Sequence, residues 1–324
     1  MLRAIFMGTP EFAVPSLLAL TEVADVSVVG VVTRLDKPIG RSRTPEAPPV
    51  KVAALAHGLP VLQPGSLRKP AAQQVLADLA PDIIIVAAFG QILPAAILDL
   101  PRYGCLNVHA SLLPRYRGAS PIAAAILAGD AATGNTIMRM DVGLDTGDII
   151  AQATLPIAPD DTTASLTAKL ATQGANLLAR TLPDWVAGSI QATPQDAALA
   201  TTTSLIRKED GRIDWALASS IIARQVRAFT PWPGSQTTWN GQPLKIIAAH
   251  PLTDDDHLPP DLALMATHGS IIAWGRGAAQ RVAVRCGKQS ALVLDVLQLP
   301  GKRATNAADV VRGQPTLVGA HLPS

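Results

Sequence analysis

The 324-residue chain has few of the features that mark secreted, zinc-stabilised or membrane-spanning proteins. Its two cysteines, Cys105 and Cys286, lie far apart and belong to no Cys-x-x-Cys pair. This spacing argues against a disulfide scaffold and a structural zinc site. No uncharged apolar run reaches the roughly 18 residues of a membrane helix, and the opening residues lack the pattern of a signal peptide. We therefore expect a reduced, cytoplasmic protein without a metal or a membrane segment.

Aromatic residues are also scarce, at 3% of the chain, so Ala, Val, Leu and Ile must form most of the core. Hydrophobic residues total 48%, which is enough for two domains at this length. The net charge of +2 excludes little, but one segment, 276–303, is locally basic. It carries one acidic residue, Asp295, against Arg276, Arg281, Arg285, Lys288, Lys302 and Arg303. Such a cluster either meets phosphates or forms a solvated basic face, and charge alone does not decide between them.

The first half of the chain alternates apolar runs with amphipathic stretches. Strands are predicted at 2–7, 26–32, 83–88 and 105–108, and helices near 14–21, 49–57, 70–79 and 119–128. This alternation predicts an α/β fold with a Rossmann-like, doubly wound, mainly parallel sheet, whose sites lie at the carboxyl ends of the strands. The first loop, Gly8-Thr9-Pro10, lacks the Gly-x-Gly-x-x-Gly pattern, which argues against a nicotinamide oxidoreductase.

The second half has a different pattern. Residues 188–206 are rich in Thr, Ala, Gln and Ser without clear periodicity, which indicates a linker. A helix is predicted near 214–228, followed by short strands at 235–239, 243–249, 270–275, 281–286 and 291–298. This spacing predicts a small OB-like antiparallel β-barrel. The expected domains are 1–187 and 207–313, followed by a tail at 314–324.

The densest polar cluster is NVHASLLPRYRG at 107–118, directly after a predicted strand. Asn107 and His109 are two residues apart, so both point to the same side of an extended segment. A second run, MDVGLDTGDI at 140–149, holds three aspartates. An Asn donor, an imidazole and a carboxylate suit direct attack by an amine on a carbonyl carbon, because the oxyanion needs donors and the amine must lose a proton. A purely structural His109 stays open, while Cys105 is predicted to be a buried packing thiol.

The runs NVHASLLPRYRGASPI and TGNTIMRMDVGLDTGDII resemble the signature of the folate-dependent formyltransferase family. The resemblance implies 10-formyltetrahydrofolate as the formyl donor and Asn107, His109 and Asp145 as the catalytic groups. Asp145 is preferred over Asp141 and Asp148 on the resemblance alone. The resemblance also implies a folate site formed by Phe89, Gly90, Gln91, Ile92, Leu93, Ser111, Leu112, Leu113, Pro114, Asp141, Val142 and Gly143.

Other segments resemble the members of this family that act on methionyl-tRNA, notably FMGTPEFAVPSL at 6–17, RKEDGRIDW at 207–215 and DVLQLPGKRATNAADVVRG at 295–313. This implies methionyl-tRNA as the acceptor and RNA binding by the second domain. A monomer is expected, because nothing in the sequence suggests an obligate interface. The expected RNA contacts are Arg41, Arg43, Lys208 and Arg303. A small amine acceptor, such as glycinamide ribonucleotide or an amino-sugar nucleotide, is the nearest alternative, and an RNA-binding module without catalysis is another.

Overall fold

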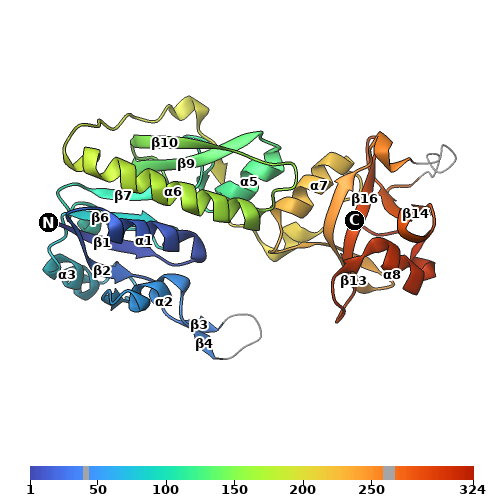
Figure 1. Cartoon of the computed structure of the whole chain (residues 1–324), viewed down its shortest axis with the longest axis horizontal. Coiled ribbons are helices and arrows are strands. Elements are labelled where there is room, and N and C mark those ends of the chain that lie inside the picture. The colour runs from blue at the N-terminus through green and yellow to red at the C-terminus, as the bar shows by residue number, and fades with distance from the viewer. Residues whose placement is uncertain (39–43, 258–266) are drawn as a thin grey trace. The chain divides into compact units, whose positions relative to one another are not determined.

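The computed structural model describes residues 1–38, 44–257 and 267–324, which belong to two compact units (Figure 1). The first unit consists of Met1–Ile122, Ala131–Ile157 and Ser165–Ser204. The second consists of Ala123–Asp130, Ala158–Ala164 and Leu205–Ser324. Within the described ranges, none of the helices has both the length and the apolar content required to cross a membrane.

Seven strands form the sheet of the first unit, in the order β10-β9-β7-β6-β1-β2-β5. The strands are β1 (Leu2–Gly8), β2 (Val26–Val32), β5 (Val61–Leu62), β6 (Ile83–Ala87), β7 (Cys105–His109), β9 (Ala132–Arg139) and β10 (Ile149–Pro156). The pairs from β5 to β7 are parallel, whereas β9 runs antiparallel to β7 and to β10. Every residue of β6 is buried, as expected for a parallel strand covered on both faces.

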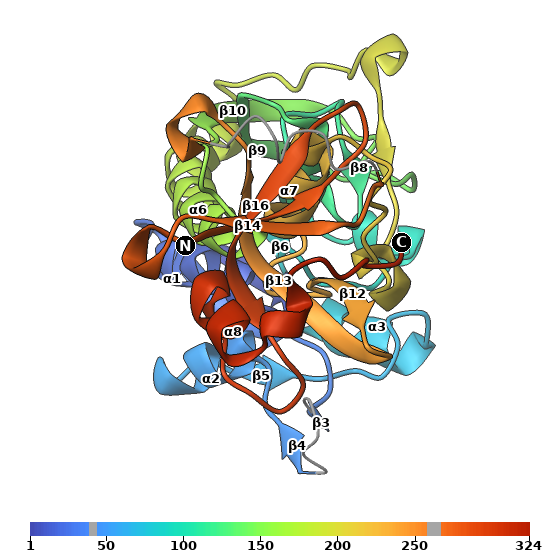
Figure 2. The same ribbon diagram turned by 90° about the vertical axis from the view of Figure 1, so that its right-hand side faces the viewer.

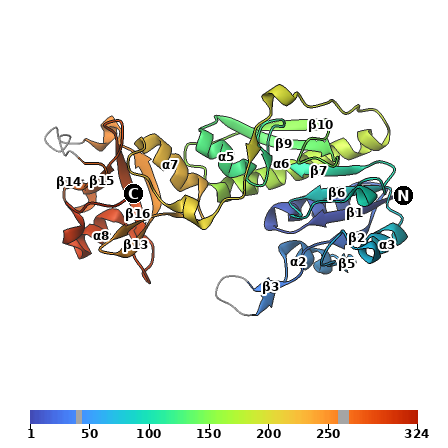
Figure 3. The same ribbon diagram turned by 180° about the vertical axis from the view of Figure 1, so that it is seen from behind.

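Helices cover both faces of this sheet. They are α1 (Val14–Glu22), α2 (Pro49–Ala56), α3 (Pro70–Asp78), α4 (Ala95–Leu98) and α6 (Thr163–Val186), whereas most of α5 (Pro121–Ala128) belongs to the second unit. Figure 1 shows α6 in front of β7 and β9, and Figure 3 shows it behind them. The contact is close, because a Cβ placed on Gly174 of α6 would lie 2.8 Å from Val108 Cγ1. A side chain at position 174 would therefore push α6 away from the sheet.

Short elements connect the larger ones in the first unit. They are the 3-10 turns η1 (Glu11–Ala13) and η2 (Ala197–Leu199) and the two-residue strands β3 (Lys37–Pro38), β4 (Pro45–Glu46), β8 (Arg117–Gly118) and β11 (Thr202–Thr203). Strands β8 and β11 pair in parallel. Through this pairing, the segment expected to be a linker lies alongside the segment that follows β7.

The second unit is built on an antiparallel sheet in the order β12-β13-β16-β15-β14, with β17 paired to β16. Its elements are η3 (Lys208–Gly211), α7 (Ser219–Ala228), β12 (Ser235–Trp239), β13 (Gln242–Pro251), η4 (Asp254–Asp256), β14 (Ile271–Trp274), η6 (Gly277–Ala279), β15 (Arg281–Arg285), β16 (Ala291–Gln298), β17 (Thr305–Asn306), α8 (Ala307–Gly313) and η7 (Pro315–Leu317). Helices α7 and α8 pack against these strands (Figure 2). The fully buried Trp215 belongs to the core that they share with the sheet. The predicted fold class, a mainly parallel α/β sheet followed by an antiparallel β domain, is confirmed.

Candidate active site

Strand β7 presents Asn107 and His109 on the same face of the sheet. Successive side chains of a strand point to opposite faces, and Val108 between them packs against α6. Asn107 and His109 therefore project from the face opposite α6, at the carboxyl end of β7. Both residues are buried, with 9% and 6% of their surface exposed. The two-residue spacing in the sequence predicted this shared face.

Asp145 meets both of these side chains. It belongs to the 140–148 segment between β9 and β10, and its carboxylate is 12% exposed. Asn107 Nδ2 donates to Asp145 Oδ1 at 3.4 Å, and His109 Nδ1 lies 3.7 Å from Asp145 Oδ2. The structure thus brings together the three residues that the sequence named as catalytic, while their role in catalysis stays a prediction.

The segment carrying Asp145 is tightly folded. Asp145 has a positive φ of 52°, a conformation that Asp adopts more readily than most residues. A Cβ on Gly147 would lie 1.7 Å from the carbonyl oxygen of Arg139, so only glycine fits there. The Asp141 carboxylate accepts a hydrogen bond from Thr146 Oγ1 at 2.7 Å. These contacts make the segment a cradle that presents one carboxylate to β7.

The residues after β7 hold the imidazole and the carboxylate from the other side. His109 Nε2 lies 3.0 Å from the carbonyl oxygen of Tyr116. A carbonyl oxygen can only accept, so Nε2 carries a hydrogen in this arrangement. The backbone N–H of Gly118 donates to Asp145 Oδ2 at 2.8 Å. Both ring nitrogens of His109 therefore face acceptors, the Tyr116 carbonyl on one side and the Asp145 carboxylate on the other.

Two residues near the site that carry nucleophilic groups are unsuited to attack. The Cys105 thiol is 1% exposed, and burial, reinforced by the charge of Asp99, raises its pKa to about 12. Ser111 is fully buried, and its hydroxyl donates to the carbonyl oxygen of Arg115 at 2.6 Å. The arrangement therefore suits a reaction in which a substrate amine, and no enzyme nucleophile, attacks the carbonyl carbon.

Comparison with known proteins agrees with this chemistry. Residues 2–182 match the family model described as formyl transferase, and residues 205–315 match the formyl transferase C-terminal domain. The chain belongs to the formyl transferase family. Its similarity to the methionyl-tRNA formyltransferase of Roseiflexus castenholzii is 48% identity, covering 96% of each chain. With the methionyl-tRNA formyltransferase of Chloroflexus aggregans it shares 45% identity, covering 99% of this chain and 98% of the relative.

Solved structures of the formyl transferase fold also resemble the chain. An N-formyltransferase from Helicobacter canadensis, crystallised with folinic acid and dTDP-3-aminofucose, superposes with a TM-score of 0.64 at 18% identity. The match covers 91% of this chain and 99% of that one. At this identity the likeness concerns the fold alone.

Five of the residues expected at the folate site of this family member follow β6. Phe89 and Leu93 are buried in the core, with 2% and 4% exposed. Gly90 has a positive φ of 76°, and Gln91 is half-buried. Ile92, by contrast, is 70% exposed. Phe89 and Leu93 therefore fix this segment to the core, while the side chain of Ile92 is exposed to solvent.

The other expected folate residues lie in two loops. In the first, from Ser111 through Leu112 and Leu113 to Pro114, Thr136 Oγ1 donates to the Ser111 carbonyl at 2.6 Å and accepts from the Leu113 N–H at 3.1 Å. Strand β9 thereby fixes this loop beside the end of β7. In the second loop, Asp141, Val142 and Gly143 are exposed, with 79% of Val142 accessible.

The residues expected to contact RNA fall in separate places. Arg41 and Arg43 lie outside the described residues, so their contact with RNA stays a prediction. Lys208, in η3, and Arg303, just before β17, are exposed in the second unit. Most of the neighbouring basic residues of 276–303 are exposed as well. Their contacts with RNA stay predictions.

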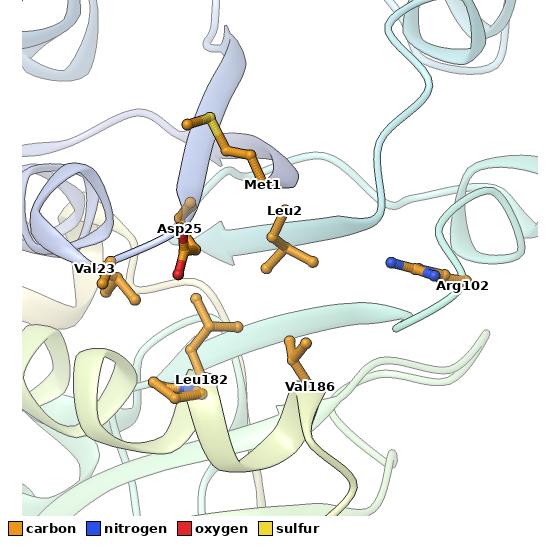
Figure 4. Close-up of a pocket in the computed structure, with 10 residues that line it drawn as sticks. Met1, Leu2, Val23, Asp25, Arg102, Leu182 and Val186 are labelled. Atoms are coloured by element: carbon orange, nitrogen blue, oxygen red, sulfur yellow. The ribbon is translucent and has the colours of Figure 1, made fainter.

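A separate recess of about 320 Å³ lies at the opposite end of the first sheet (Figure 4). Leu2, at the start of β1, lines it together with Asp25, Arg102, Leu182 and Val186. Because β1 and β7 point the same way, this recess is at the amino ends of the strands, away from Asn107 and His109. In residues 1–38, 44–257 and 267–324, no three His, Cys, Asp or Glu side chains are grouped so as to hold a metal ion.

Three contributors to the site were missed by the sequence reasoning. Two of them are backbone groups, the carbonyl of Tyr116 and the N–H of Gly118. Almost every residue type has these groups, so the sequence does not reveal which ones reach the site. Gln195 donates to the carbonyl oxygens of Asp145 and Gly147 at 2.9 and 2.7 Å. It lies in the segment interpreted as a linker, where a single polar residue among many gave no signal.

Proposed function

We propose that the chain transfers the formyl group of 10-formyltetrahydrofolate to the free α-amine of methionyl-tRNA. The observation that carries the proposal is the buried convergence of Asn107, His109 and Asp145 at the end of β7. The choice of acceptor is supported by the full-length similarity to methionyl-tRNA formyltransferases, which extends through the second unit.

Each residue has a defined role in the proposed reaction. The amine nitrogen attacks the formyl carbon, and negative charge develops on the carbonyl oxygen as the new C–N bond forms. Asn107 donates to that oxygen through its amide, and His109 does so with Nε2, which must exchange the Tyr116 carbonyl for the oxyanion. Asp145 holds the His109 ring in position. The amine gives up a proton to the His–Asp pair as it attacks, and the pair returns a proton to the folate nitrogen as the bond from that nitrogen to the formyl carbon breaks.

The proposed donor site includes two exposed apolar side chains that the family resemblance assigns to it. Ile92, in the segment after β6, and Val142, three residues before Asp145, are 70% and 79% exposed. We propose that the flat ring of the folate covers them, next to the loop from Ser111 to Pro114.

The acceptor site is supported by charge. Lys208 and Arg303 are exposed, as are several basic residues of the 276–303 segment. Basic side chains bind an RNA backbone through its phosphates, largely without regard to base sequence. We propose that these residues bind the acceptor end of the tRNA, as do Arg41 and Arg43, which lie outside the described residues.

The test is a purified reaction with three acceptors. The full chain is incubated with 10-formyltetrahydrofolate and methionyl-tRNA, glycinamide ribonucleotide or an amino-sugar nucleotide, and products are detected by mass spectrometry. We expect formyl-methionine on the tRNA and no product from the small amines. Formylation of a small amine alone would contradict the proposed acceptor, and tRNA binding without turnover would contradict the activity.

Variants of the three residues test the proposed roles. We expect His109→Ala or Asp145→Asn to lower kcat by about 10²–10³-fold, the loss typical of one preorganised donor or acid–base group. Asp148→Asn, three residues away in the same segment, is the matched control and should retain nearly normal activity. Equal effects of Asp145→Asn and Asp148→Asn would contradict the assignment of Asp145.

A further inference from the structure

The segment between the matched family regions lies against the candidate site. Thr193 forms a bridge with Ile149, at the start of β10. Further on, the Tyr116 N–H donates to Thr201 Oγ1 at 2.8 Å, and the Arg117 N–H donates to the Thr201 carbonyl at 2.9 Å. We call residues 193–203 the strap. The strap contacts both backbone segments that hold His109 and Asp145.

Gln195 is the residue of the strap that reaches deepest into this arrangement. Its amide nitrogen donates to the carbonyl oxygens of Asp145 and Gly147. Its amide oxygen accepts from Arg117 Nε at 3.0 Å and from a terminal nitrogen of the same guanidinium at 2.8 Å. One side chain thus has both donor hydrogens and its acceptor oxygen in use, which is close to the full capacity of a glutamine.

These contacts join the two parts that fix the Asp145 carboxylate. One part is the backbone of Asp145 itself, which adopts a positive φ. The other is Gly118, next to Arg117, whose N–H donates to Asp145 Oδ2. Gln195 connects the two, because it donates to the Asp145 carbonyl and accepts from Arg117, the neighbour of Gly118. A shift of either part would move the carboxylate relative to His109, from which it is 3.7 Å distant.

We propose that Gln195 is a positioning residue for formyl transfer, which sets the Asp145 carboxylate against His109 from the strap. The inference rests on the proposed function for its kinetic consequence but not for its structural one. A misplacement of about 1 Å at a catalytic group can lower the rate by roughly 10²-fold without weakening substrate binding.

The first experiment compares Gln195→Ala, Gln195→Glu and a control, Gln191→Ala, in the full chain. Gln191 is exposed in the same stretch of sequence. We expect Gln195→Ala to lower kcat by about 10–100-fold while the KM for methionyl-tRNA changes less than about twofold. Gln195→Glu keeps the size and the acceptor for Arg117 but faces two carbonyl oxygens without a donor, so we expect a loss at least as large. Normal activity of Gln195→Glu would overturn the proposal.

A double-mutant cycle separates positioning from a general structural effect. If Gln195 acts through Asp145, then Gln195→Ala should cost much less in an Asp145→Asn background, less than about threefold, because coupled residues are not additive. The same fold-loss in both backgrounds would show that Gln195 does not act through the carboxylate.

Hydrogen exchange tests whether Gln195 holds the 141–148 segment in place, and it does not depend on formyl transfer activity. Peptides that cover 141–148 should exchange roughly tenfold faster or more in Gln195→Ala than in the unaltered chain or in Gln191→Ala, because two hydrogen bonds to the segment are lost. Unchanged exchange would overturn the proposal. If the unaltered chain forms no formyl-methionine, the proposed function fails, and this exchange measurement still decides the role of Gln195.

Discussion

The backbone N–H of Gly118 donates to Asp145 Oδ2 at 2.8 Å, across 27 positions of sequence. Gly118 has a φ of +106°, and a Cβ on it would lie 2.4 Å from the carbonyl oxygen of Thr203. Three segments therefore meet at this glycine: the one after β7, the one carrying Asp145, and the strap. Only a residue without a side chain lets them approach so closely.

The Gly118→Ala substitution should damage both stability and activity. The added methyl group would collide with a backbone atom, and the positive φ is unfavourable for alanine. We expect a loss of about 1–3 kcal/mol in the free energy of unfolding and a fall in kcat. Gly65→Ala is the control, because a Cβ at Gly65 meets nothing within 4 Å. Thermal unfolding and formyl transfer measured on both variants check this, and similar values for the two would contradict it.

Several elements were predictable because their signals are local. Strand β2 spans Val26–Val32 and β12 spans Ser235–Trp239, the same bounds that the sequence predicted. The first is a nearly continuous apolar run, and the second ends at an Asn-Gly turn. Strand β9, Ala132–Arg139, was not predicted, since its buried Asn135 and Thr136 break the apolar pattern. The 24-residue helix α6 was also absent from the prediction.

The residues of the candidate site also differ in whether a local sequence pattern could predict them. Asn107 and His109 were paired from their spacing, because alternation along a strand is a local rule. Asp145 was named only through the family resemblance, since its approach to β7 depends on a loop that packs far from its own neighbours in sequence. The role of the strap was not predicted. Its contacts go to backbone N–H and carbonyl groups, which every residue type carries, so the residues that receive them have no recognisable sequence pattern.

The amide of Asn107 should be required as a neutral donor. In Asn107→Asp, a second carboxylate would replace the amide that lies 3.4 Å from Asp145, and a donor to the oxyanion would be lost. We expect kcat to fall by about 10²–10³-fold. Asn176→Asp makes the same chemical change at an exposed position of α6 and should leave kcat nearly unchanged. Steady-state formyl transfer by the two variants checks this, and an active Asn107→Asp would rule out the donor role.

Both cysteines should be unreactive in the folded chain. Burial raises the pKa of Cys105 and of Cys286 to about 12, so both thiols are protonated at pH 8, and only thiolates react rapidly with alkylating agents. Iodoacetamide at pH 8 should therefore leave the mass and the formyl transfer of the native chain unchanged. The same treatment in denaturant should add two alkyl groups. Rapid alkylation of the native chain at Cys105, with loss of activity, would instead favour a role for that thiol.

His250 in the second unit should make stability depend on pH. Its Nδ1 lies 2.9 Å from Asp295 Oδ2 and its Nε2 lies 3.3 Å from Asp256 Oδ1, so the ring links β13 to β16 and η4. Partial burial lowers the pKa of His250, but the hydrogen bonds and charges of Asp295 and Asp256 outweigh burial and raise it above 6.5. His250 lines a recess of the second unit, and the other charged residues of that recess are Asp255, Asp256, Arg281 and Asp295.

The direction of the pH effect follows from that raised pKa. A group with a higher pKa in the folded state stabilises the fold fully below its unfolded pKa, and the stabilisation is lost as pH rises through the folded pKa. The His250 ring is 42% exposed, so the contribution should stay below about 1 kcal/mol. Thermal unfolding should thus show His250→Gln destabilised relative to the unaltered chain at pH 6 and less so at pH 8.5. Asp295→Asn removes one partner and should reduce this pH dependence, whereas a difference that grows toward high pH would show that the ring is not held in its charged form.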